Sequence, residues 1–164
     1  MPLSRLQRFK EAQEQRASGF ESALSELRAG GKRSHWIWYV FPQLVGLGQS
    51  AASQMYGLDG VAEAEEYLRD PLLRSRLLTI ATVVIEQVGA EGGGSLESLM
   101  ASPIDVAKLV SSMTLFGHVA QRLHKAEGLD EYASIAVVAD DVLAVAAAEG
   151  YPPCHFTLHR LRRA

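Results

Sequence analysis

Two short motifs mark the starts of two long helices and constrain the fold more than any other feature. Asp70-Pro71 and Ser102-Pro103 each join a helix-capping residue to a proline, which fits the first helical turn because no amide donor is needed there. After each motif, apolar side chains recur every three or four residues, the spacing of one buried helix face. The two apolar series are Leu73, Leu77, Ile80 and Val84, then Val106, Leu109, Met113, Phe116, Ala120 and Leu123. This spacing predicts helices over about residues 71–88 and 103–125.

The other segments also favour helices. Ser4 with Gln7, and Ser18 with Glu21, have the spacing of a capping box, which predicts two helices near the N-terminus. Residues 36–41 are rich in strand-forming side chains, but no partner strand is evident, so a short buried helix ending before Pro42 fits better. Further helices are expected at residues 50–56, 61–69 (with Glu63 and Glu66 on its outer face), 95–100, 129–149 and 156–163. We therefore expect one compact, multihelical, all-α domain with short connections over residues 1–164.

Composition excludes several classes of protein. The 164 residues carry a formal net charge of -3, so no nucleic-acid partner is expected. The longest apolar run, residues 77–85, is far shorter than the roughly 20 residues of a membrane span, so no membrane partner is expected either. Cys154 is the single cysteine, which excludes an internal disulfide, and no secretory signal is evident, so the cytoplasm is the expected compartment. No cofactor motif is present, no cofactor is expected, and the oligomeric state is not predicted.

The segment Lys32–Gly48 concentrates the unusual chemistry of the chain. Lys32, Arg33 and Ser34 precede the two tryptophans of the protein, Trp36 and Trp38. In a functional interpretation, the cations and Ser34 hold a phosphate or carboxylate, and one indole stacks on a flat ring. In a structural interpretation, the indoles are core anchors and the cations are solvated.

Three neighbours of the tryptophans extend this candidate site. The imidazole of His35 can act as a general acid or base, or it can satisfy a buried carbonyl. The Gln43 amide can bind the edge of a ligand or the backbone of its own loop. Gly46 allows a close approach of the backbone. The segment has neither a dinucleotide fingerprint nor a phosphate-binding P-loop.

A second polar cluster lies on the long helix predicted after Pro103. Asp105, Lys108 and Ser112 share one helix face, and Ser111 and Thr114 flank Met113. This cluster can form a second wall facing the Lys32–Gly48 segment. The alternative is a surface ion pair with hydroxyls bonded back to the helix. Ser111, Ser112 and Thr114 are all unfavourable in a helix, and helix propensity does not explain why three such residues fall within four positions.

A metal site is not expected. Cys154, His155 and His159 are residue types that bind metals, but no second pair of ligands accompanies them. Cys154 also lacks an identified base that would make it a nucleophile.

The two polar segments resemble the signature of a bacterial family of unknown function, the domain of unknown function 1810. The longest match runs from Arg33 to Gly48, and the second runs from Lys108 to Phe116. The resemblance covers about residues 3–125, implies an all-α fold and carries no catalytic assignment. From about residue 126 the chain departs from the family pattern. The family often has an aspartate three residues before a Thr-Leu pair, whereas here Cys154 precedes Thr157-Leu158.

Two functions follow from these residues. The first is a site for a small anionic, ring-bearing, nucleotide-like ligand between Lys32–Gly48 and the Asp105–Thr114 face, with His35 as the catalytic residue if that ligand is hydrolysed. Whether the protein is an enzyme is left open. The alternative is a non-enzymatic interaction module, with the aromatic segment 35–41 as a groove or interface, or as a purely structural clasp. The exposure of Trp36, Trp38 and His35 is expected to discriminate between them.

Overall fold

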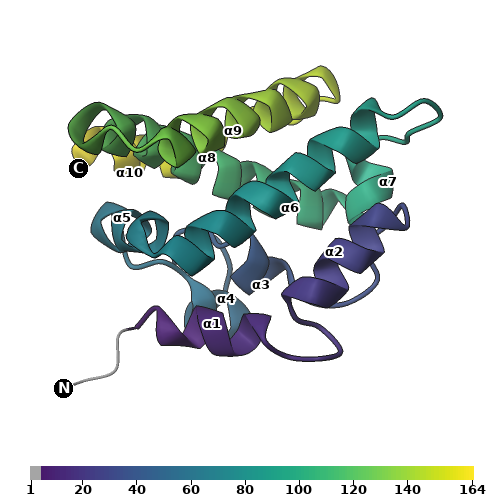
Figure 1. Ribbon diagram of the computed structural model, residues 1–164, viewed down its shortest axis with the longest axis horizontal. Coiled ribbons are helices and arrows are strands. Elements are labelled where there is room, and N and C mark those ends of the chain that lie inside the picture. The colour runs from purple at the N-terminus through teal and green to yellow at the C-terminus, as the bar shows by residue number, and fades with distance from the viewer. Residues whose placement is uncertain (1–4) are drawn as a thin grey trace.

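The computed structural model describes residues 5–164, which form ten helices and no β-strand in that range (Figure 1). The all-α prediction is therefore confirmed. The helices are α1 (Gln7–Gln13), α2 (Phe20–Arg28), α3 (Ile37–Val40), α4 (Ala51–Tyr56), α5 (Val61–Arg69), α6 (Pro71–Gly89), α7 (Leu96–Met100), α8 (Pro103–Glu127), α9 (Asp130–Ala148) and α10 (His155–Arg163). Within the described residues, no helix has both the length and the apolar character needed to cross a membrane.

Helix α8 lies at the centre of the domain. It packs against α3, α5, α7, α9 and α10, and α6 in turn packs against α2, α5, α7 and α9 (Figure 1). All of residues 109–117 are buried, so neighbouring parts of the chain cover this part of α8 almost completely. The polar side chains that the sequence places on this part of the helix therefore lie in the interior with it.

Helices α8 and α9 approach closely at Gly117. A Cβ atom placed on Gly117 would lie 3.0 Å from the Cβ of Ala139, which is tighter than an ordinary van der Waals contact. We expect Gly117→Leu to lower the free energy of unfolding by about 3 kcal/mol, because the added side chain has no space at this crossing. Urea denaturation measures this loss. Ala139→Gly in the same chain should recover part of it, and an equal loss with and without that second change would contradict the contact.

The predicted helix starts are confirmed on α6 and α8 and wrong on α2. Asp70 accepts hydrogen bonds from the amides of Leu72 and Leu73, and Ser102 accepts one from the Asp105 amide. Helix α2 instead begins after Gly19, which has no side chain to cap it, and the Ser18 hydroxyl donates to the side chain of Gln15. The prediction for Ser4 lies outside the described residues.

Glu63 is not on the outer face of α5, so that prediction is wrong. Its side chain is buried against α1, where the Arg8 guanidinium donates to the carboxylate at 3.0 Å and the Asp59 amide donates to it at 2.9 Å. Arg8 also donates to the carbonyls of Met55 and Gly57. This largely buried ion pair ties α1 to the chain between α4 and α5. Glu66 is exposed, as predicted.

Candidate functional site

The first half of the Lys32–Gly48 segment is organised around the carboxylate of Glu26, near the end of α2. One carboxylate oxygen accepts from the amides of Arg33 and Ser34 at 2.6 and 2.7 Å and from the Trp36 indole at 3.0 Å. The other oxygen accepts from the Ser34 hydroxyl at 2.7 Å. Trp36 is fully buried. We call these contacts the Glu26 clasp, and Ser34 and Trp36 are engaged in it as structural groups.

The clasp sets the ionisation of Glu26. Burial of the carboxyl raises its pKa, but the hydrogen bonds from Ser34, Arg33 and Trp36 outweigh this and lower the pKa from 4.5 to about 2. Glu26 therefore stays anionic far below neutral pH.

Lys32 and Lys108 share one carboxylate. The buried Lys32 ammonium lies 2.9 Å from Asp105 and donates to the Ser34 carbonyl at 2.6 Å. The Lys108 ammonium lies 3.5 Å from the same carboxylate. This ion cluster joins the residues before α3 to the start of α8, so the two polar segments of the sequence are in contact.

Trp38 and Ser112 each hold a buried polar atom that has no partner in the part of the chain that the structure describes. The Lys108 ammonium lies over the Trp38 ring, 4.6 Å from its centre, and Ser112 is one turn further along α8. The indole nitrogen of Trp38 and the hydroxyl of Ser112 are buried and make no hydrogen bond to any described residue. Such groups are rare because each costs desolvation free energy. The junction of α3 and α8 therefore has unused hydrogen-bonding capacity.

The side chains of Arg33 and His35 take no part in the clasp. Both are exposed, and neither makes a hydrogen bond or ion pair with the described residues. Gln43 is 7% exposed, and its side-chain amide likewise has no described partner, although its backbone carbonyl accepts from the Leu58 amide. These three residues do not come together in either of the cavities described next.

A hollow of about 290 Å³ lies beside α8. It is lined by Leu47, Ala107, Val110, Ser111, Tyr151, Pro152 and Cys154. Gly46, at φ 103°, is closed over by the ring of Phe156, which would lie 3.0 Å from a Cβ there. Ser111 donates to the Ala107 carbonyl, while Thr114 donates to the Val110 carbonyl and accepts from the Cys154 amide. Ser111 is thus at a surface hollow, whereas Thr114 holds the C-terminal segment in place.

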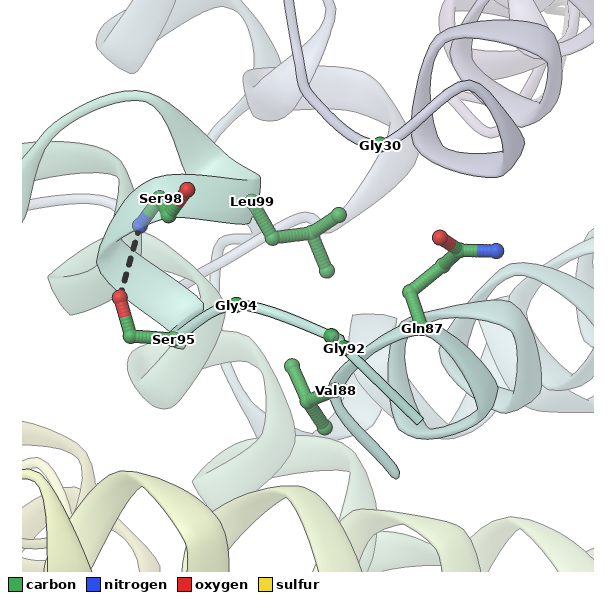
Figure 2. A pocket seen from close by; sticks show the side chains of 9 residues that line it. Gly30, Gln87, Val88, Gly92, Gly94, Ser95, Ser98 and Leu99 are labelled. Atoms are coloured by element: carbon green, nitrogen blue, oxygen red, sulfur yellow. Dashed lines mark hydrogen bonds between the residues drawn. The ribbon is translucent and has the colours of Figure 1, made fainter. Parts of the chain in front are cut away.

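A further cavity, of about 330 Å³, lies beside the glycine-rich loop between α6 and α7 (Figure 2). Gly92 and Gly94 border it, with Gln87 and Leu99 among its other lining residues (Figure 2). The amide of Leu96 at the start of α7 already donates to the Glu149 carboxylate at 3.0 Å. The Leu96 amide at this helix start is therefore already occupied and cannot bind an anion in the cavity.

Sequence reasoning missed Glu26 as the organising residue. Its signal was weak: a carboxylate beside the apolar stripe of α2, seven residues before Arg33, with nothing in the spacing to show that the chain folds back onto it. It also missed Leu47 and Tyr151, whose hollow joins three segments that are distant in sequence. No group of three or more His, Cys, Asp or Glu side chains in the described range is arranged to hold a metal.

Comparison with known proteins places this fold in a family. The family described as a protein of unknown function (DUF1810) matches residues 3–138. The chain belongs to this family. The match extends beyond residue 125, and therefore into α9. The conserved hypothetical protein Rv1873 from Mycobacterium tuberculosis is 35% identical in sequence, with a TM-score of 0.70 over 94% of each chain. No curated protein matches this member of the family.

Proposed function

We propose that this protein binds a small anionic, ring-bearing molecule where α3 meets α8. The proposal rests on one observation: the Trp38 indole nitrogen and the Ser112 hydroxyl are buried and have no partner among residues 5–164, and both belong to the segments joined by the Lys32–Asp105–Lys108 cluster. A ligand that accepts a hydrogen bond from each would recover the free energy lost by their desolvation.

The charges at this junction support an anionic ligand. Two ammonium groups face the Asp105 carboxylate, so these three groups carry a formal excess of one positive charge, and the Glu26 carboxylate bound to Ser34 is a second anion nearby. Arg33 and His35 add exposed donors on the adjoining surface. Lys108 can turn from the face of the Trp38 ring toward a phosphate or carboxylate, which leaves the ring for a flat ligand group.

The proposal concerns binding rather than catalysis. A general base needs a group that orients it, and the His35 ring has no hydrogen-bond partner among the described residues. An aromatic interface at residues 35–41 has less support, because Trp36, Ile37, Tyr39, Val40 and Phe41 are all buried. The Glu26 clasp is compatible with the proposal, since it fixes the position of the residues that precede Trp38.

Ser112→Ala is expected to stabilise the ligand-free protein and to weaken binding of the proposed ligand. Removing an unpaired buried hydroxyl should raise the free energy of unfolding of the ligand-free protein by about 1 kcal/mol. Chemical denaturation measures this. Ser111→Ala is the matched control: it has the same change in helix propensity, but its hydroxyl donates to the Ala107 carbonyl, so we expect a smaller gain. Equal gains in the two variants would argue that the Ser112 hydroxyl is not an unused donor.

The ligand itself is sought by thermal shift with nucleoside mono- and diphosphates and sugar phosphates. A compound present at 100 times its dissociation constant should stabilise the protein by about 2.7 kcal/mol. Isothermal titration should then show at least tenfold weaker binding for Lys108→Met and for Trp38→Phe. Lys125→Met, at an exposed lysine in the last turn of α8, should leave affinity unchanged. No stabilisation by any compound, or equal losses for Lys108→Met and Lys125→Met, would overturn the proposal.

A further inference from the structure

An apolar groove follows the outer junction of α6 and α9. Two adjoining hollows, of about 440 and 390 Å³, share Ile85 and Asp141 and so form one continuous depression. Figure 1 shows the two helices side by side, running in the same general direction. The stretch of α6 that lines the groove, from Leu78 to Gly89, is about 16 Å long at 1.5 Å per residue. That length accommodates about three turns of a docked helix.

The groove is lined by apolar side chains that are partly or largely exposed to solvent. Val137, on α9, is 61% exposed, and Leu78, Ile85 and Val145 are partly buried beside it. Helix-binding grooves are built this way, with apolar side chains that receive residues spaced at i, i+3, i+4 and i+7. The groove shares no residue with the α3–α8 junction, so it is independent of the small-molecule site.

The charged side chains of the groove are all acidic. They belong to Glu86, Asp141 and Glu149, and neither α6 after Arg76 nor any part of α9 contains a lysine, arginine or histidine. Glu149 already binds the Leu96 amide, whereas Glu86 and Asp141 make no ion pair or hydrogen bond within the described residues. Two carboxylates are thus free to pair with an incoming cation.

We propose that this groove docks a cationic amphipathic helix of a partner protein. Apolar residues of that helix would cover Val137 and Ile85, and its lysines or arginines would pair with Glu86 and Asp141. The negative charge of Glu86 and Asp141 favours a cationic helix. The two carboxylates would repel an acidic helix, and a neutral helix would leave them without ion-pair partners. The basic α10 of a second copy does not qualify, because its buried side chains Thr157 and Leu161 are already committed within its own chain.

A designed peptide tests the groove directly. The probe is an 18-residue helix of leucine and lysine with leucines at i, i+3, i+4 and i+7, a length that spans about 27 Å. Fluorescence anisotropy should show it binding the full-length protein, with binding at least tenfold weaker for a peptide of the same composition and scrambled leucine spacing. Val137→Asp should weaken binding at least tenfold. Leu72→Asp, at an exposed leucine near the start of α6 and outside the groove, should not.

Charge reversal distinguishes the groove from a generally sticky surface. The double variant Glu86→Lys with Asp141→Lys should lose the lysine peptide and bind a leucine–glutamate peptide of the same spacing. Asp140→Lys, at an exposed residue of α9 that does not line the groove, should keep the original preference. Equal binding of the scrambled peptide, or a double variant that still prefers the lysine peptide, would overturn the proposal. Circular dichroism of each variant confirms that lost binding is not lost folding.

Discussion

Glu26→Ala is expected to lower the free energy of unfolding by about 3 kcal/mol at pH 7. Four hydrogen bonds end on this carboxylate, and without it the Arg33 and Ser34 amides and the Trp36 indole lose their acceptor. Urea denaturation measures the loss. Glu21→Ala is the control on the same helix, because Glu21 is exposed and makes no ion pair or hydrogen bond within the described residues. Similar losses for the two variants would show that the clasp contributes little.

The same carboxylate makes part of the stability depend on pH. Because the folded-state pKa of Glu26 is lowered from 4.5 to about 2, its contribution is complete above pH 4.5 and is lost as the pH falls toward 2. The difference in unfolding free energy between the wild type and Glu26→Gln should therefore shrink across this interval. A difference that stays constant from pH 7 to pH 2 would contradict the lowered pKa.

Glu63→Ala should lower the free energy of unfolding by about 3 kcal/mol or more, as much as Glu26→Ala, because it leaves the Arg8 guanidinium without its buried partner. Arg5 is a second cation near the same carboxylate, at 3.6 Å. Burial raises the pKa of Glu63, but the hydrogen bonds from Arg8 and the Asp59 amide and the charges of Arg8 and Arg5 lower it overall. This stability is therefore also present above the ordinary carboxyl pKa and falls in acid.

Glu66→Ala is the matched comparison for Glu63, since both residues lie on α5 and only Glu66 is exposed. We expect its effect on the unfolding free energy to lie within about 0.5 kcal/mol. Thermal denaturation of both variants at pH 7 measures the contrast. A loss of the same size at both positions would mean that the ion pair with Arg8 is not what stabilises the junction of α1 and α5.

The sequence predicted elements whose causes are local, and failed where the cause was distant. Asp70 and Ser102 cap their helices because each bonds amides two or three residues away, so the pattern was visible in the chain. Glu63 lies one turn before the buried Tyr67 on α5, but a carboxylate is ordinarily exposed unless a partner is known. Its burial follows from Arg8, 55 residues away, and no pattern on α5 indicates that partner.

The candidate site shows the same division. The contact between the two polar segments was predictable because both stood out for residues that packing and propensity do not explain. The sequence did not predict which residues of these segments have structural partners. Ser34 and Trp36 bind Glu26, while Trp38 and Ser112 each have a polar atom with no hydrogen bond to a described residue. That distinction depends on how α2, α3 and α8 meet in space. The proposed ligand contacts are therefore centred on Trp38, Lys108 and Ser112, and no longer on the whole of both segments.

The packing of α9 on α6 has a consequence for biosynthesis. Helix α6 ends at Gly89, but the helix that covers its apolar side is complete only at Ala148, about 60 residues later. At a ribosomal rate of about 5–20 residues per second, the side of α6 that α9 will cover waits roughly 3–12 s after α6 has been made. During that interval the nascent chain exposes this apolar face of α6, to which chaperones can bind and on which other nascent chains can aggregate. Synthesis at a slower rate should therefore increase the aggregation of this protein.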